Sequence, residues 1–354
     1  HFQKIMLLDK SIPELAAGLR KGDFTSADLV NECYDNIYKY NDKINAFITI
    51  LPRDTALNQA KLVKLTSPLS GIPFVLKDCY VTKNLKTTCA SNVLNNFTPP
   101  YSATVYQKLL NAGAILIGKM NMDAWGHGGS SENTDFGPVK NPWDTTRVAG
   151  GSSGGPAAAI SARMAVFAIG EDTGGSIRNP AAWCGITGLK VTYGRVSRYG
   201  SVAYASSLDS VGPMAKSTQD CAVILETIAG QDPLDATSSP HPVPSYSTQL
   251  SQVSPKTKIG IPKEMFGQGL DSEMKKIILA TLNIFQKIGY ETVEVTLDTT
   301  YKYGVYAYHL TVPSETSSNL ARYDGIRYGS SRDHFTDETK RRIMVGTYAL
   351  SAGY

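Results

Sequence analysis

A helical repeat of apolar positions lies near the start of the chain. Ser11 followed by Pro13 predicts a helix with Ser11 as its cap and Pro13 in the first turn. A second helix is predicted to begin at Thr25. Its apolar positions are predicted to share one face, and they are Leu29, Cys33, Ile37 and Tyr38.

Short, wholly apolar runs follow, and they alternate with further helical segments. The runs at 46–51, 71–78, 114–118 and 166–170 predict strands, and the segments at 103–111 and 157–163 predict helices. Strands that are apolar at every position are typical of sheets with both faces covered. The sequence therefore predicts an α/β fold with a central mixed sheet covered by helices on both faces.

The composition changes once along the chain and divides it into three expected parts. Residues 236–258 are rich in serine, proline and threonine, which predicts a surface loop or linker. A strand, an amphipathic helix and a second strand are predicted after it. We therefore expect a core with N-terminal helices at 1–235 and a peripheral αβ lobe at 236–300. The segment 301–354 should return to the core, which is then incomplete at its C-terminal end.

Composition and charge exclude several classes of protein. The chain has 354 residues, of which 42% are hydrophobic and 19% charged, as in ordinary globular proteins. Its net charge is +4, and its longest basic cluster, 340–342, lies in a helical pattern. A solvated helix face is therefore favoured over a nucleic-acid contact. No window approaches the roughly 20 apolar residues of a membrane-spanning helix.

Five cysteines are scattered along the chain without Cys-x-x-Cys spacing, which disfavours both zinc and a disulfide framework. We expect buried, reduced thiols, as in an intracellular protein. Cys79 lies two residues after Lys77. It is either a reactive thiol or an apolar filler, and the second interpretation is favoured.

Two serine clusters set among glycines are the strongest chemical signal. The first, 150–155, reads Gly-Gly-Ser-Ser-Gly-Gly, and the second, 172–180, reads Asp-Thr-Gly-Gly-Ser-Ile-Arg-Asn-Pro. Glycine lets main-chain N–H groups approach a ligand closely, and a nucleophilic serine needs such donors for the developing oxyanion. A phosphate-binding loop is disfavoured because no Lys-Ser/Thr pair follows the glycines.

Two catalytic interpretations compete. The run 150–154 matches a Gly-x-Ser-x-Gly nucleophile elbow, which needs an acid and a histidine further along the chain. Three histidines follow the run, none of them in a supporting motif: His241, His309 and His334. The other interpretation pairs a serine with a buried neutral lysine, and Lys77 ends an apolar run that would desolvate it. Taken alone, Lys77 would be read as a lysine whose stem lies along apolar surface at a strand end.

These motifs together resemble the amidase signature family. The resemblance includes the run 71–78, both serine clusters and the spacing of Lys77, Ser152 and Ser176. Within that family the chain is similar to the ammonia-producing subunits of tRNA-dependent glutamine amidotransferases. The segments that support this narrower resemblance are 118–123, 129–133, 136–138, 188–200, 207–209 and 318–329.

The resemblance implies a role for each polar residue of the site. Ser176 would be the acylated nucleophile, Ser152 the bridging serine after a cis peptide, and Lys77 the terminal base. A neutral Lys77 would accept the Ser152 proton while Ser152 accepts that of Ser176. The implied oxyanion hole consists of the N–H groups of Thr173, Gly174, Gly175 and Ser176.

The resemblance also implies how the substrate is held. Gly129 and Ser130 would lie beside the ligand, and Tyr308 and Arg342 near its amino-acid head group, with Arg342 paired to the α-carboxylate. The alternative for Arg342 is a solvated surface position. No metal or cofactor is expected in this chain, whereas ATP and Mg²⁺ are expected at a partner B subunit.

The implied activity is hydrolysis of glutamine. The ammonia would pass to the B subunit, which converts Glu-tRNA(Gln) to Gln-tRNA(Gln), while a small third subunit, C-like or fungal F-like, braces the pair. A basic pI near 8.6 and the segment 125–129 favour the mitochondrial matrix over a bacterial cytoplasm. The alternatives are a stand-alone amidase-signature hydrolase of another amide and a catalytically silent scaffold subunit.

Three features depart from the family pattern. Pro156 stands where a small residue is usual, at a position in the first turn of a helix that tolerates proline. Glu171 replaces a small or polar residue and is expected to change the local field. The sequence stops at Tyr354, where relatives continue with core strands and with the acidic residue that receives the substrate's α-amino group.

Overall fold

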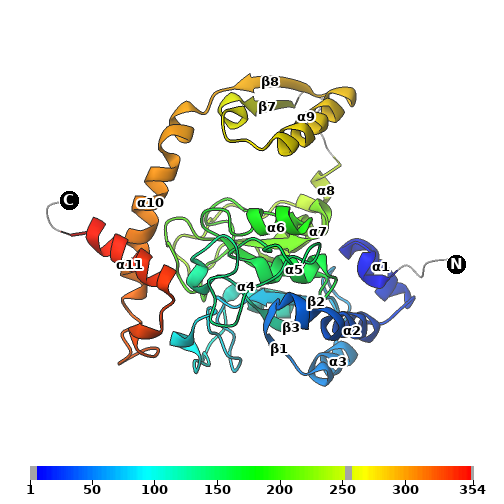
Figure 1. Cartoon of the computed structure of the whole chain (residues 1–354). Coiled ribbons are helices and arrows are strands. Elements are labelled where there is room, and N and C mark those ends of the chain that lie inside the picture. Colours follow the sequence, from blue (N-terminus) through cyan, green and yellow to red (C-terminus); the bar gives the residue numbers. More distant parts are fainter. Residues whose placement is uncertain (1–5, 252–256, 352–354) are drawn as a thin grey trace. The chain divides into compact units, whose positions relative to one another are not determined.

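The structure is a computed structural model that describes residues 6–251 and 257–351 (Figure 1). The chain divides into two units: unit 1 contains 1–247 and 312–354, and unit 2 contains 248–311. The lobe expected at 236–300 overlaps unit 2, whose two boundaries lie further along the chain.

Unit 1 contains the larger sheet and most of the helices. Its strands are β1 (Phe47–Ile50), β2 (Pro73–Lys77), β3 (Ile115–Met120), β4 (Phe167–Asp172), β5 (Thr187–Gly188) and β6 (Ser210–Ala215). Its helices are α1 (Ile12–Lys21), α2 (Ser26–Ile44), α3 (Arg53–Leu62), α4 (Thr104–Asn111), α5 (Gly154–Ser161), α6 (Arg178–Cys184), α7 (Thr218–Ile228) and α11 (Asp337–Ala349). Two more helices, α8 (Tyr246–Gln249) and α10 (Asp298–Leu320), run from one unit into the other.

The larger sheet is mixed and has the strand order β1-β3-β2-β4-β6-β5. β2 pairs in parallel with both β3 and β4, whereas β1, β5 and β6 pair antiparallel to their neighbours. Every residue of β2, β3, β4 and β6 is buried. Since successive side chains of a strand point to opposite faces, both faces of these strands are covered. The mixed α/β fold expected from the sequence is confirmed.

The two N-terminal helices begin where the sequence predicts. Ser11 and Thr25 each accept a hydrogen bond from the backbone three residues on, and each forms a capping box with the acidic residue there. The prediction that Tyr38 shares a face with Leu29 is wrong, because Leu29 is buried and the Tyr38 side chain is 60% exposed. At about 100° per residue Tyr38 lies half a turn from Leu29, and Tyr34 is buried instead, with its hydroxyl donating to the Leu51 carbonyl at 2.7 Å.

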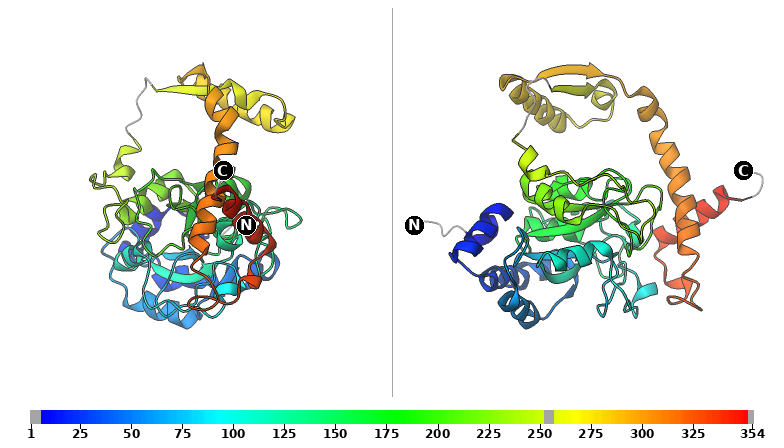
Figure 2. Two further views of the ribbon diagram at one scale, coloured as in Figure 1. Left: turned by 90° about the vertical axis from the view of Figure 1, so that its left-hand side faces the viewer. Right: turned by 180° about the vertical axis from the view of Figure 1, so that it is seen from behind.

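The segment 312–320 of α10 packs against α11 within unit 1 (Figure 2). Gly346 of α11 lies so close to the Pro313 carbonyl that a Cβ at this position would collide with it. This close approach fixes the part of α11 that carries Arg342. All five cysteines of the chain are free and buried, as expected.

Unit 2 is a small αβ unit. Its strands β7 (Lys258–Pro262) and β8 (Glu291–Val295) pair in parallel, and α9 (Ser272–Lys287) lies between them in the chain. Asp271 caps α9 through the N–H groups of Glu273 and Met274. This is the strand, helix and strand predicted after the linker. In the described part of the chain, no helix combines the length and apolarity needed to cross a bilayer.

We expect Phe74→Ala to destabilise unit 1 by about 3–5 kcal/mol. The Phe74 ring in β2 is fully buried and stacks on Phe167 of β4 at a centroid distance of 5.3 Å. Chemical unfolding followed by tryptophan fluorescence measures the loss, since all three tryptophans lie in unit 1. The control is Leu62→Ala, where the side chain is 82% exposed and the expected change is within about 0.5 kcal/mol. Equal losses in the two variants would contradict the prediction.

Candidate active site

Lys77 is the last residue of β2, and its side chain is completely buried. β2 and β4 are parallel neighbours, so their carboxyl ends meet at the same edge of the sheet. The second serine cluster begins at the last residue of β4 and runs into α6, and the first leads into the start of α5. Lys77 Nζ lies 2.8 Å from Ser152 Oγ and donates a hydrogen bond to it. The lysine predicted as the base therefore contacts the serine predicted as the bridge.

The two serine clusters are joined through their backbones. The Ser153 N–H donates to the Ser176 carbonyl at 3.1 Å, and the peptide between Gly151 and Ser152 is cis, as the resemblance implies. Both predicted catalytic serines are buried, Ser152 with 1% and Ser176 with 7% exposure. Within the described residues no hydrogen bond joins their two hydroxyl groups. The structure thus contains one of the two hydrogen bonds that a relay needs.

Asp172, the last residue of β4, shapes the loop that carries Ser176. Its carboxylate accepts the N–H groups of Gly175 at 2.8 Å and Ile177 at 3.0 Å, and it pairs with the Arg178 guanidinium at 2.9 and 3.1 Å. Burial raises the pKa of Asp172, but the bonds from Arg178 and the backbone outweigh it and hold that pKa below its usual value. Asp172 and Arg178 therefore position the loop.

The predicted oxyanion hole needs one correction. The Gly175 N–H is already donated to Asp172 Oδ1, so this group is occupied in the structure. The glycines of the sequence indicate the donors, whereas no local pattern indicates that Asp172 takes one of them. Within the described residues, the N–H groups of Thr173, Gly174 and Ser176 have no partner in the chain, and these three can meet an oxyanion.

Glu171 brings a carboxyl group against Lys77. Its Oε2 lies 3.4 Å from Lys77 Nζ, and the side chains are 3% and 0% exposed. The backbone carbonyl of Glu171 also accepts a bond from Ser153 Oγ at 3.2 Å. Burial raises the pKa of the Glu171 carboxyl, and the positive charge of Lys77 offsets this only in part. The expected change of the local field at this position thus has a structural basis.

Asp123 is a second buried acid beside the site. Its Oδ2 accepts the Ser131 N–H at 3.0 Å and its Oδ1 the Asn133 N–H at 3.2 Å, while its own N–H donates to the Ser152 carbonyl. The Asp123 carboxylate lies so close to Gly151 that a Cβ there would collide with it. Burial raises the pKa of Asp123 to about 6, against the opposing effect of these hydrogen bonds and of nearby Lys77 and Arg342.

The four residues predicted to bind substrate differ from one another in their exposure and in the unit to which they belong. Gly129 is exposed, and the Ser130 backbone N–H lies beside Gly151. Arg342 is not a solvated surface residue, because only 13% of its side chain is exposed. It pairs with Glu338 at 2.7 Å and hydrogen-bonds the Tyr204 hydroxyl. Tyr308 belongs to unit 2, so its substrate role stays a prediction.

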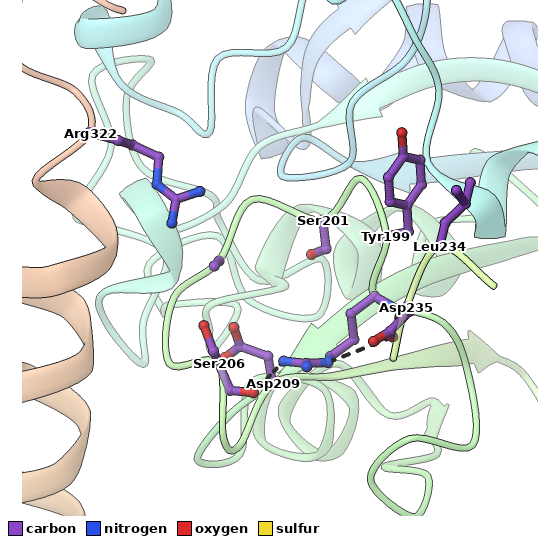
Figure 3. Close-up of a pocket in the computed structure, with 9 residues that line it drawn as sticks. Tyr199, Ser201, Ser206, Asp209, Leu234, Asp235 and Arg322 are labelled. Atoms are coloured by element: carbon purple, nitrogen blue, oxygen red, sulfur yellow. Dashed lines mark hydrogen bonds and ion pairs between the residues drawn. The ribbon is translucent and has the colours of Figure 1, made fainter. Parts of the chain in front are cut away.

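Figure 3 shows a cavity of about 290 Å³ that is lined by residues such as Ser206, Asp209 and Arg322. Asp209 lines it, and the carboxylate of this residue accepts a 2.6 Å hydrogen bond from Thr173 Oγ1. Burial and the charge of Glu171 raise the pKa of Asp209 to about 8. Asp209 thus joins the cavity to the candidate site, and none of the predicted catalytic residues lines it.

No cluster of three or more histidine, cysteine, aspartate or glutamate side chains that could hold a metal ion occurs among the described residues. His127 is buried, and its Nδ1 lies 3.0 Å from Thr339 Oγ1. Burial lowers the pKa of His127 well below its usual value, so the ring is neutral. Cys79 is also fully buried, which raises the pKa of its thiol and opposes the reactive interpretation.

Sequence reasoning missed Asp123 and Asp209 as neighbours of the site. For Asp123 a signal was present, because it follows β3, which ends at the same sheet edge as its parallel neighbour β2. For Asp209 no comparable signal existed, since β6 runs antiparallel to β4 and places the residue before its start beside the end of β4.

This fold and site define a class of protein: the chain belongs to the amidase family, whose model matches residues 28–354. Within it, the chain is 46% identical to the A subunit of the glutamyl-tRNA(Gln) amidotransferase of Chromohalobacter salexigens, over 98% of this chain and 75% of that protein. The corresponding A subunit of Geobacillus kaustophilus is 47% identical over 98% of this chain and 76% of its own length. The crystal structure of the A subunit from Thermotoga maritima matches with a TM-score of 0.83 at 36% identity, over 98% of this chain and 72% of that one.

The raised pKa of Asp123 predicts a pH-dependent stability difference between the wild type and Asp123→Asn. An acid whose pKa is higher in the folded state than in the unfolded one destabilises the fold when ionised. The contribution of Asp123 to stability should therefore increase as the pH falls, from about 6 in the folded state towards 3.8 in the unfolded one. Over this window the wild type should gain about 3 kcal/mol relative to the variant. Urea unfolding at pH 7 and pH 4 measures the gain, and a pH-independent difference would contradict it.

Proposed function

We infer that this chain is the glutaminase component of a Glu-tRNA(Gln) amidotransferase, which releases ammonia from glutamine for the conversion of Glu-tRNA(Gln) to Gln-tRNA(Gln). The observation that carries this function is the 46% identity to an amidotransferase A subunit along 98% of the chain. The contact between Lys77 and Ser152 supports it, because a lysine-activated serine is the chemistry that amide hydrolysis requires.

The proposed reaction begins with Ser176 as the nucleophile. Its proton passes to Ser152 and the Ser152 proton to a neutral Lys77, while Ser176 Oγ forms a bond to the side-chain carbonyl carbon of glutamine. The hydrogen bond between Ser152 and Lys77, which the second proton transfer needs, is present in the structure. The hydrogen bond between the Ser176 and Ser152 hydroxyl groups would form when the Ser176 side chain rotates on substrate binding. Catalytic hydrogen bonds often form only in the complex with substrate.

The N–H groups of Thr173, Gly174 and Ser176 would stabilise the oxyanion of the tetrahedral intermediate, each donor being worth about 3–4 kcal/mol of barrier. Lys77 would then return its proton, through Ser152, to the leaving nitrogen, and ammonia departs. Water attacks the remaining ester of Ser176 in the same way and releases glutamate. No metal ion or cofactor of this chain has a part in these steps.

The proposed partners are a B subunit, which would bind ATP, Mg²⁺ and the tRNA, and a small third subunit. Among compartments we favour the mitochondrial matrix, on the basis of a pI near 8.6 and the segment 125–129. Fluorescence of the tagged full-length gene product, compared with a matrix marker, tests this assignment, and a cytosolic signal would exclude it.

Ser176→Ala should abolish glutamine hydrolysis by the assembled complex, and Ser152→Ala and Lys77→Ala should each reduce kcat at least about a thousandfold, since the members of such a unit act together. Glutamate release is measured with and without charged tRNA and the B subunit. Ser161→Ala, in the last turn of α5, is the matched control and should keep wild-type activity. Full activity of Ser176→Ala would exclude the mechanism.

The same assay separates the alternative functions. Stimulation of glutamine hydrolysis by tRNA and the B subunit supports the proposed function. Rapid hydrolysis of other amides by the chain alone would instead identify a stand-alone hydrolase. Binding of the B subunit without any hydrolysis would identify a scaffold.

Arg342→Ala should raise KM for glutamine at least about tenfold, because a bidentate charge-assisted contact to the α-carboxylate is lost. Hydrolysis of an amide that lacks the α-carboxylate should change much less. Arg341→Ala is the matched control: Arg341 also pairs with Glu338, but 56% of its side chain is exposed. Equal effects of Arg342→Ala on both substrates would show that Arg342 acts on the fold and does not bind glutamine.

A further inference from the structure

The contact between Lys77 and Glu171 is unusual in its isolation from water. Oε2 of Glu171 lies 3.4 Å from Nζ of Lys77, with both side chains essentially buried. Glu171 is the one buried glutamate among the described residues. The rest of the mechanism, a serine pair and a lysine, does not use this carboxyl group. The burial of the Glu171 carboxyl group needs a physical explanation, because keeping a buried acid ionised costs free energy.

The surroundings of Glu171 suit an ionised carboxylate poorly. Its Oε1 is buried with no hydrogen-bond partner among the described residues, and the adjacent Cys79 thiol is a weak donor. Its Oε2 has a single long contact to Lys77. An ion pair in a dry site is favoured only when the remaining lone pairs are satisfied. A protonated carboxyl that donates from Oε2 to a neutral amine leaves one uncharged oxygen without a partner, which costs less.

The neighbouring charges also favour the protonated acid. Asp172, although paired with Arg178, places negative charge beside Glu171 and raises its pKa. The positive charges at this end of the sheet have their own partners, since Lys119 is bound to Asp78 at 2.8 Å. The titratable and charged groups that face the pair are Asp78, Cys79, Tyr80, Lys119, Asp123, Asp172, Arg178 and Asp209.

We propose that Glu171 is a positioning residue that holds the proton which Lys77 must give up before it can act as a base. This rests on the proposed function, in which Lys77 accepts a proton from Ser152. In the resting state the two side chains share one proton. An N–H bond of the Lys77 ammonium breaks, an O–H bond forms at Glu171 Oε2, and both groups become neutral. Rotation about the Cε–Nζ bond then turns the amine lone pair from Glu171 towards Ser152 Oγ, whose proton it accepts. No proton leaves the protein, and neither member of the pair keeps a charge.

The pair explains how a buried lysine can be neutral at ordinary pH. An isolated ammonium becomes neutral only by losing a proton to the solvent, so the active fraction falls tenfold for each pH unit below its titration. A lysine that transfers its proton to Glu171 is neutral in a fixed fraction of molecules over the whole range in which the pair holds one proton. Activity then stays level until the pair takes up a second proton at lower pH.

The test is the pH profile of kcat/KM for glutamine, measured on the assembled complex with Glu171→Gln. We expect the acid limb to move upward by at least about one pH unit and kcat/KM at pH 7 to fall at least about tenfold, because the amide carbonyl accepts a bond from the ammonium and the amide N–H donates to the neutral amine more weakly than a carboxyl O–H. The two profiles should converge at alkaline pH. Glu171→Asp, which keeps a carboxyl group on a shorter side chain, should restore part of the acid limb. Arg178→Lys is the control on the neighbouring loop, and it should change the rate without moving the limb.

An unchanged acid limb would overturn the proposal. A limb that moves to lower pH would also overturn it, because that result is expected when Glu171 only stabilises the ammonium. A wild-type complex that does not hydrolyse glutamine at all refutes the proposed function instead, so the two failures are distinguishable.

A second measurement needs no variant and therefore does not depend on folding of Glu171→Gln. The wild-type chain is labelled with carboxyl-¹³C glutamate, reassembled with unlabelled partners and examined by infrared spectroscopy at pH 7. We expect a carboxylic-acid C=O band that shifts with the label and therefore comes from a glutamate, not from Asp209. Absence of a labelled protonated band would overturn the proposal.

Discussion

The burial of the Lys77 amine is the constraint on which the rest of the site depends. β2 is apolar at every position before Lys77, and all its residues are covered on both faces of the sheet. Burial disfavours an ammonium, and a neutral amine is the form that can take a proton from a serine. The same burial removes water that would compete for the Ser152 hydroxyl. The core of the fold and the chemistry of the site thus depend on the same strand.

Parallel pairing supplies the geometry. Because β2 lies between β3 and β4 and runs parallel to both, three strand ends meet at one edge, carrying Lys77, Asp123 and Glu171. The segments that follow these ends need close backbone approaches. Gly151 meets the Asp123 carboxylate, and Gly155 meets the carbonyl of Asn121, at distances that leave no room for a Cβ. The glycines of the first serine cluster are therefore explained by packing as well as by catalysis.

The sequence allowed Lys77, Ser152 and Ser176 to be selected, because a charged residue at the end of an apolar strand and serines among glycines are local patterns. It could not show which donors are free. Asp172 occupies the Gly175 N–H, a fact that depends on how the loop turns back over the end of β4. Tyr38 is apolar enough to suggest the buried face of α2, but its angle around the helix axis places it opposite Leu29. Arg342 stands beside the exposed Arg341, and only the packing of α11 buries one side chain and exposes the other.

Each ionised acid near the catalytic lysine would stabilise its ammonium form, and the charge of each acid is neutralised in a different way. Asp172 is neutralised by Arg178 and by backbone N–H groups, and its pKa is held low. Asp78 forms an ion pair with Lys119, a second buried lysine, so its negative charge is neutralised by Lys119 and not by Lys77. Glu171 has neither a full set of donors nor a second cation, so its charge is the one that the site can least retain. An acid in that position is stabilised by becoming neutral, and Lys77 contacts it with a proton to give.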